Sequence, residues 1–206
     1  MKPKQKIKAV IFDISNVLVA SDTEAMFKQL LKYSAIKKKR AILIENHDQL
    51  TAFVDYGTGK INSHEFYKKT CEHLKLSGIG YDKFRKIWNS AFEPNKQVEK
   101  IVKELFGDYS LIVASDINRM HFDFLKDNYK ILQYFDPKFL SFREKVLKRD
   151  KKFFRKMIET LKIKPSQCIF IDDRDINIKN AKFYRLNTVQ YKNPSQLKRE
   201  LSTLLT

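Results

Sequence analysis

The chain has 206 residues, of which 43% are hydrophobic, including 16 phenylalanines and 9 tyrosines. This content is sufficient for one packed domain, or for one domain carrying an insert, and it argues against wholesale disorder. Only 5 glycines and 5 prolines are present, which disfavours a sandwich of many short strands. No apolar run reaches the roughly 18 residues that a membrane span needs, so we expect no membrane partner.

The amino-terminal stretch MKPKQKIKAVIFDI places basic residues before an apolar run, as a signal peptide does. This run is short, ends at an acid and lacks a small-residue cleavage site, so we predict a mature cytoplasmic protein. The two cysteines, Cys71 and Cys168, form neither a disulfide framework nor a metal-binding spacing. A reducing compartment is therefore expected.

The formal net charge is +17, with basic clusters at residues 37–40 and 148–152. Such a charge is typical either of a nucleic-acid-binding face or of a solvated lysine surface. We favour the solvated surface, because lysines are spread over nearly every predicted helix and alternate with acids. No recognition motif with aromatic platforms or zinc-ligand spacing accompanies them. Nucleic acid remains an alternative partner.

The first predicted element is a buried strand at residues 7–13, and helical patterns follow from about 22 to 92. In the stretch HEFYKKTCEHL, one helix face carries Phe66, Tyr67, Cys71 and Leu74. Asn62 and Glu65 have the spacing of a capping pair at the start of that helix. The stretch YDKFRKIW gives a second amphipathic helix, with its apolar face formed by Tyr81, Phe84, Ile87 and Trp88.

Beyond residue 93 the pattern changes to helices and strands in alternation. We predict helices at 95–106, 118–127, 150–161 and 176–184 and a last one beginning at Asn193, with strands at 110–115, 139–141, 168–172 and 187–191. This alternation predicts an α/β fold with a parallel, Rossmann-like sheet. Residues 1–15 and 93–206 would form this core, and residues 16–92 an inserted α-helical domain.

Polar residues follow three of the predicted strands. Asp13 follows the first strand, Ser115 and Asp116 the second, and the pair Asp172 and Asp173 the fourth, while Lys148 precedes the helix at 150–161. Because ligands gather at the carboxyl ends of parallel strands, we expect these side chains to form one site. A hydroxyl and a lysine suit a phosphate, and grouped carboxylates suit Mg²⁺.

Four segments, IFDISNVLV, LIVASDIN, the region of Lys148 and FIDDRDIN, resemble the four motifs of the haloacid dehalogenase (HAD) superfamily. The match covers nearly the whole chain. The segments GTGKINSHEFY and FRKIWNSAFEPN also resemble the helical cap of a subgroup that contains sugar-phosphate phosphatases and the amino-terminal phosphatase domain of epoxide hydrolases.

The resemblance implies a Mg²⁺-dependent phosphohydrolase in which Asp13 is the nucleophile and forms an aspartyl-phosphate. It implies Mg²⁺ ligation by the side chains of Asp13 and Asp173 and the carbonyl of Ser15, with Asp172 behind them. Phosphoryl oxygens would be held by Ser115, by backbone N–H groups around Asp116, and by Lys148. Two secondary roles stay open: Asn177 or Asp175 would brace the metal loop, and Asn118 either serves the site or caps the next helix.

Three residues depart from the family pattern. Ser15 stands where most phosphatases of the family carry an aspartate that acts as general acid and base, although the members that look most similar have a small residue there and some of these are still phosphatases. Asp116 stands where asparagine is usual, and Arg149 where proline is usual. Since a general acid typically contributes roughly 10²–10⁴-fold, a catalytically weak member is one alternative to a phosphatase acting on a small phosphorylated metabolite.

Two further points stay open at the level of sequence. A dehalogenase is a third reading, but the Asp172–Asp173 pair argues against it because carbon–halogen cleavage needs no metal. Lys60, in the cap loop 57–60, either reaches the site or is an ordinary exposed lysine.

Overall fold

The computed structural model describes residues 6–36 and 51–206, so the basic cluster at 37–40 lies outside the described residues. A five-stranded sheet with the order β5-β4-β1-β6-β7 forms the centre of the molecule, and all its neighbouring strands are parallel. The strands are β1 (Ala9–Phe12), β4 (Ser110–Ser115), β5 (Lys138–Leu140), β6 (Cys168–Asp172) and β7 (Asn187–Gln190). The predicted α/β, Rossmann-like fold is confirmed.

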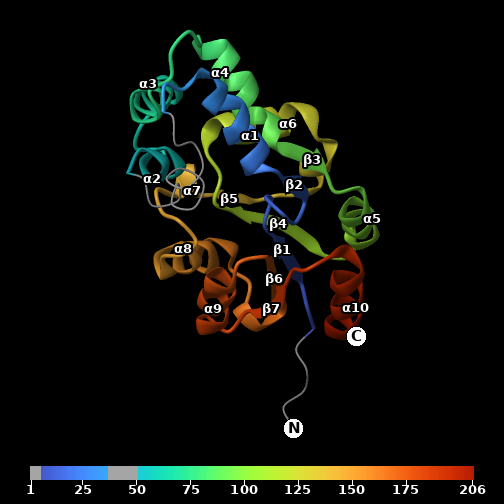
Figure 1. Cartoon of the computed structure of the whole chain (residues 1–206). Coiled ribbons are helices and arrows are strands. Elements are labelled where there is room, and N and C mark those ends of the chain that lie inside the picture. The colour runs from blue at the N-terminus through green and yellow to red at the C-terminus, as the bar shows by residue number, and fades with distance from the viewer. Residues whose placement is uncertain (1–5, 37–50) are drawn as a thin grey trace.

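Helices cover both faces of this sheet (Figure 1). One hydrophobic cluster joins the sheet to α5 (Lys96–Leu105), α6 (Arg119–Asn128) and α10 (Pro194–Leu205), and a second joins it to α8 (Lys151–Leu161) and α9 (Asp175–Phe183). In β1, Val10 and Phe12 belong to the first cluster, while Ala9 and Ile11 belong to the second. Successive residues of a strand point to opposite faces, which explains why AVIF is apolar throughout.

Four helices lie beyond the end of the sheet at which β1 finishes (Figure 1). They are α1 (Thr23–Leu30), α2 (Thr51–Gly57), α3 (Ser63–Leu74) and α4 (Tyr81–Trp88). The predicted capping box of α3 is confirmed, because the Asn62 side chain accepts from the backbone N–H of Glu65 and the Glu65 carboxylate accepts from that of Asn62.

A short antiparallel ribbon connects these helices to the sheet. It pairs β2 (Val19–Ser21) with β3 (Phe92–Pro94). The sequence analysis predicted no strand here. Three-residue strands are too short to show a period-two pattern, and the ribbon is formed by pairing between segments far apart in the sequence.

The loop after α2 is attached to the core by hydrogen bonds. Ser141 Oγ donates to the Gly57 carbonyl at 2.7 Å, and Lys145 Nζ donates to the Gly59 carbonyl at 2.8 Å. Both donors belong to the segment formed by α7 (Ser141–Glu144) and the residue after it. Gly59 has φ +63°, and a Cβ there would lie 2.3 Å from the Phe142 carbonyl oxygen, so this close approach requires glycine.

Candidate active site

The site lies where the strand order of the sheet reverses. From β1 the chain passes outward through β4 and β5, and then returns to β6 and β7 on the other side. A crevice at the carboxyl ends of the strands is expected at such a point. Asp13, Ser115 and Asp172 stand at the ends of β1, β4 and β6, which are neighbours in the sheet.

Lys148 joins two of these residues. Its Nζ lies 2.7 Å from Asp13 Oδ2 and 2.6 Å from Asp172 Oδ2, and its side chain is 1% exposed. A lysine of this kind can neutralise charge only if its backbone is held in place. Its N–H donates to Asp116 Oδ1 at 2.7 Å, and Asn180 Nδ2 donates to the carbonyls of Lys148 and Arg149 at 3.1 and 2.9 Å. These bonds fix the turn although Arg149 replaces the usual proline.

Asp172 is buried and surrounded by hydrogen-bond donors. Its Oδ1 accepts from the Arg174 backbone N–H at 2.9 Å, and its two oxygens accept from Asn177 Nδ2 at 3.0 and 3.1 Å, in addition to the bond from Lys148. Of the two residues that the sequence suggested for bracing this loop, Asn177 contacts Asp172, whereas Asp175 pairs with Lys179 at the surface. Asp172 positions Lys148.

Asp173 is tied to the turn after β1. Asn16 Nδ2 donates to Asp173 Oδ2 at 3.0 Å, and Ser21 Oγ donates to Asn16 Oδ1 at 2.8 Å. Asn16 has φ +60°, a left-handed conformation that asparagine tolerates better than most residues. Asn16, Asn180 and Arg174 were not predicted as site residues from the sequence. Asn16 could have been recognised from its position in the tight turn SNV, since asparagine favours such turns.

Lys148 and the carboxylates around it interact electrostatically. Burial raises the pKa of Asp13 to about 7, Lys148 opposes this effect, and Asp172 adds to it. Burial by itself would lower the pKa of Lys148, but the charges of Asp13, Asp172 and Asp116 raise it above its usual range. The carboxylates therefore favour the charged form of Lys148, and a further positive charge near Asp13 would favour the ionised form of its carboxyl group.

The carboxylates fit a divalent cation. One oxygen from each of Asp13, Asp172 and Asp173 lies within 4.8 Å of the others. Hard oxygen donors at this spacing suit Mg²⁺. The Asp172 carboxylate accepts four hydrogen bonds from protein donors, whereas that of Asp13 accepts two and that of Asp173 accepts one from Asn16, so Asp13 and Asp173 keep more lone pairs for a cation.

The hydroxyl of Ser115 is suited to an anion. Its Oγ is buried and close enough to the Asp13 carboxylate to lower the pKa of Asp13, but it makes no hydrogen bond of normal geometry with the described residues. Asn118, in contrast, accepts from the His121 backbone N–H, so it caps α6. Lys60 pairs with Asp55 at 3.3 Å and does not line the pockets described below.

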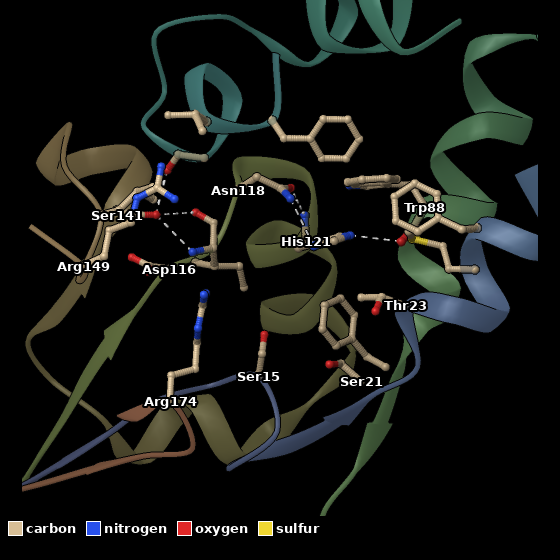
Figure 2. Close-up of a pocket in the computed structure, with 18 residues that line it drawn as sticks. Ser15, Ser21, Thr23, Trp88, Asp116, Asn118, His121, Ser141, Arg149 and Arg174 are labelled. Carbon is tan, nitrogen blue, oxygen red and sulfur yellow. Dashed lines mark hydrogen bonds between the residues drawn. The ribbon is translucent and has the colours of Figure 1, made fainter. Parts of the chain in front are cut away.

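Two cavities meet at this site. One of about 360 Å³ is lined by Asp13, Lys148 and Asp173, among others. The second, of about 220 Å³, extends from it between the sheet end and the helices α1, α2 and α4. Figure 2 shows Ser15, Asp116 and Arg174 on one side of this second cavity and Trp88 and His121 on the other. The residues common to both cavities are Ser15, Ser21, Thr23, Asp116 and Arg174.

Comparison with known proteins agrees with this geometry. The profile of the haloacid dehalogenase-like hydrolases matches residues 7–182. The chain is 23% identical to D-ribitol-5-phosphate phosphatase of Bacteroides thetaiotaomicron, covering 97% of this chain and 98% of that protein. It is also 23% identical to flavin mononucleotide hydrolase 1 of Arabidopsis thaliana, covering 98% of this chain and 79% of that protein.

Solved structures show the same fold. A HAD family enzyme from B. thetaiotaomicron, in complex with magnesium and inorganic phosphate, is 25% identical, with a TM-score of 0.80 over 91% of this chain and 95% of that chain. A HAD-like hydrolase from Porphyromonas gingivalis is 20% identical, with a TM-score of 0.82 over 98% of each chain.

The chain belongs to the haloacid dehalogenase-like hydrolase family. In the part of the chain that the structure describes, no helix is both long and apolar enough to cross a bilayer.

Proposed function

We propose that this protein is a Mg²⁺-dependent phosphohydrolase that cleaves a small phosphate monoester through an aspartyl-phosphate intermediate. The observation that carries the proposal is the buried contact of Lys148 with both Asp13 and Asp172, with the buried hydroxyl of Ser115 beside Asp13. The names of its relatives, which include a ribitol-phosphate phosphatase and a flavin mononucleotide hydrolase, support this reading.

Asp13 is the nucleophile in this proposal. One of its oxygens attacks phosphorus, the bond to the leaving oxygen breaks, and water then attacks the same phosphorus to release phosphate and regenerate the carboxylate. Ser115 donates to a phosphoryl oxygen, and Lys148 balances the charge that accumulates in the transition state. When bound, Mg²⁺ screens the repulsion between the carboxylate and the phosphate dianion.

Mg²⁺ would be held by the side chains of Asp13 and Asp173 and by the carbonyl of Ser15. Asp172 would not bind Mg²⁺ directly; it orients Lys148, whose Nζ donates to Asp172 Oδ2. Asp116 acts in a similar way, because its carboxylate accepts from the Lys148 N–H. The backbone around Asp116 is thus the part that would contact a phosphoryl oxygen, since a carboxylate there would repel it.

Residues 16–92 would form the cap over this site, with 1–15 and 93–206 as the core. The β2–β3 ribbon supports these boundaries because its two strands lie close to them in sequence. A reducing, cytoplasmic location fits two cysteines that remain free thiols, with burial raising the pKa of Cys168 to about 11.

Phosphate release from an aryl phosphate tests the proposal. We expect hydrolysis with Mg²⁺, loss of activity in EDTA, and recovery when Mg²⁺ is restored. The variant Asp13→Asn keeps the size of the side chain but removes the nucleophile, so it should be inactive. Full activity in Asp13→Asn, or activity that is indifferent to EDTA, would disprove the assignment.

The absent general acid favours a second candidate, a catalytically weak member of the family that binds a phosphorylated ligand. The specific observation is Ser15, which lines both cavities where a proton donor would stand. This candidate predicts saturable binding of phosphorylated compounds with little turnover of any of them.

A further inference from the structure

The cavity next to the catalytic carboxylates has an aromatic wall. Trp88 and His121 stack with ring centroids 5.1 Å apart and an interplanar angle of 15°, and Phe27 and Phe53 meet the indole edge-on at 6.1 and 5.8 Å. Phe92 completes the wall. The three charged residues that line the cavity, Asp116, Arg149 and Arg174, lie on the opposite side in Figure 2. A ligand that spans the cavity thus meets charge at one end and rings at the other.

One polar atom of this wall lacks an acceptor. Trp88 Nε1 is buried without a hydrogen-bond partner among the described residues, and the residue is 4% exposed. Figure 2 shows the indole edge that carries Nε1 directed toward the interior of the cavity. A buried N–H without an acceptor is unfavourable, and buried donors are seldom left in that state. A ligand atom with a lone pair would satisfy it.

His121 does not supply a proton to such a ligand. Its Nε2 lies 3.0 Å from the Trp88 carbonyl, and its Nδ1 lies 3.1 Å from Asn118 Nδ2. The Asn118 carbonyl oxygen already accepts from the His121 backbone, so the amide presents its NH₂ group to Nδ1. Nδ1 is therefore an acceptor and Nε2–H a donor to the carbonyl. Both ring nitrogens are occupied by the protein.

The size of the cavity suits one aromatic ring. Its volume is about 220 Å³. An apolar cavity of about 150 Å³ holds benzene, whereas pockets for drug-sized ligands begin at about 300 Å³. The cavity therefore has room for one substituted ring, and it is continuous with the neighbouring cavity of about 360 Å³ that holds the carboxylates.

Ser15 restricts the chemistry of the leaving group. A phenol, with a pKa of about 10, leaves as a phenolate without help, whereas an alkyl alcohol, with a pKa near that of water at about 16, needs a proton. A serine hydroxyl cannot donate that proton effectively at neutral pH. A site with Ser15 in place of the acid is suited to leaving groups that depart as anions.

We propose, on the basis of the function proposed above, that the leaving group of the substrate is a single aromatic ring carrying a hydrogen-bond acceptor that Trp88 Nε1 binds. In the first step Asp13 forms a bond to phosphorus, the bond from phosphorus to the phenolic oxygen breaks, and the electron pair stays on the phenolate. In the second step water attacks phosphorus, the Asp13–phosphorus bond breaks, and the water proton goes to solvent. Atoms and charge balance without an internal proton donor.

Steady-state kinetics of the wild-type protein with Mg²⁺ test whether the leaving group is a single aromatic ring that departs as an anion. We expect kcat/KM for phenyl phosphate and 4-nitrophenyl phosphate to exceed that for glycerol 3-phosphate by about 10²-fold or more, since that is the contribution of a missing general acid. Flavin mononucleotide, an alkyl phosphate with three fused rings, should be as poor as glycerol 3-phosphate. Equal or better hydrolysis of glycerol 3-phosphate overturns this inference and leaves the phosphohydrolase intact. No hydrolysis of any of the four compounds overturns both.

The variant Trp88→Phe tests the acceptor. It removes the N–H and keeps an aromatic ring, so KM for 4-nitrophenyl phosphate should rise about fivefold more than KM for phenyl phosphate, the effect of one hydrogen bond, because both substrates feel the smaller ring but only one carries the acceptor. Phenyl phosphate is thus the matched control within one protein. An equal change for both substrates would overturn the contact with Trp88. A thermal melt identifies a misfolded variant, in which case the wild-type comparison decides the inference.

Discussion

Lys148 brings a positive charge into a buried group of carboxylates. Nearly all of its polar atoms have partners: the side chain contacts Asp13 and Asp172, the N–H contacts Asp116 and the carbonyl contacts Asn180. A buried charge is tolerated only when it is paired in this way. The same contacts hold Lys148 beside Asp13, where an incoming phosphoryl group would meet it. The stability of the buried carboxylates and the proposed reaction thus depend on the same side chain.

Ser15 is the residue that limits activity in this account. Replacing it by aspartate supplies a proton donor at the boundary of the two cavities, and we expect Ser15→Asp to raise kcat on glycerol 3-phosphate by at least 10-fold, within the roughly 10²–10⁴-fold range of general acid catalysis. Steady-state phosphate release measures it. Ser15→Asn, which has a similar shape and no acidic proton, is the control. An unchanged rate in Ser15→Asp would mean that another group already supplies the proton.

His121 makes the stability of the protein depend on pH. Burial lowers its pKa to about 4, while the Trp88 carbonyl opposes the shift, and an unfolded histidine titrates near 6.5. Between these values the unfolded chain binds a proton that the folded protein does not, so the free energy of unfolding falls as the pH falls from 6.5 to 4. The total contribution is about 3 kcal/mol, present above pH 6.5 and lost toward pH 4.

Urea unfolding across this range, compared with His121→Phe, measures the effect. The variant keeps a ring against Trp88 and Phe92 but cannot titrate. Its stability should decline less steeply toward pH 4 than that of the wild type. Parallel curves for the two proteins would show that His121 is not buried in its neutral form.

Single residues were predictable where their chemistry matched their position in a motif. Asp13, Ser115, Lys148 and Asp172 follow from strand ends and from the family pattern, and the structure brings them together. Arg174 and Asn180 did not follow, because their function depends on which loop packs against which, and a single sequence does not encode that as a local pattern.

At the level of elements, the loop after α2 determines how the helical segment is held against the core. Gly59 is essential to that attachment, because its φ is +63° and a Cβ would lie 2.3 Å from the Phe142 carbonyl oxygen. We expect Gly59→Ala to lower the free energy of unfolding by at least about 1–2 kcal/mol, the cost of a left-handed alanine. The steric clash should add to this and raise KM, since Gly57 lines the aromatic cavity.

Gly78→Ala is the matched control for this prediction. Gly78 has φ +68°, and a Cβ there would have no atom within 4 Å. It therefore isolates the backbone strain from the clash. Chemical denaturation and steady-state kinetics of the two variants give the comparison. Equal losses in both variants, with no effect on KM, would show that the contact between Gly59 and Phe142 does not hold the loop.

The strands of the central sheet were predictable, including the three-residue β5, which was expected at 139–141 and lies at Lys138–Leu140. The strands at 110–115 and 168–172 were predicted with the boundaries that the structure has, because each is a continuous apolar run ending at a polar residue. The ribbon of β2 and β3 was missed, because its pairing joins residues about 70 positions apart, and such pairing leaves no local signal.

At the scale of the whole molecule, the net charge of +17 is its most unusual property. A positive field attracts anionic substrates and increases their association rate. We expect kcat/KM for aryl phosphates to fall several-fold between about 0.01 and about 0.15 M salt, over which the Debye length shrinks from about 30 to about 8 Å. Initial rates at low substrate concentration measure it, and kcat is the internal control because saturation removes the association step.

A kcat/KM that does not change with salt would show that the net positive charge does not speed the association of substrate. The nucleic-acid alternative would then gain weight, and its own signature is binding of duplex DNA that weakens steeply with salt.

Transfer of the phosphoryl group to Asp13 is the central claim. The most direct measurement is to mix the protein with 4-nitrophenyl phosphate and Mg²⁺, quench in acid, and locate the added phosphoryl group by peptide mass spectrometry. Because Ser15 cannot activate the attacking water, the intermediate should persist long enough to be trapped. The account predicts a phosphoryl group on the peptide that contains Asp13, and none in Asp13→Asn or without Mg²⁺. Release of 4-nitrophenol with the phosphoryl group on another residue, or on none at any time point, would contradict it.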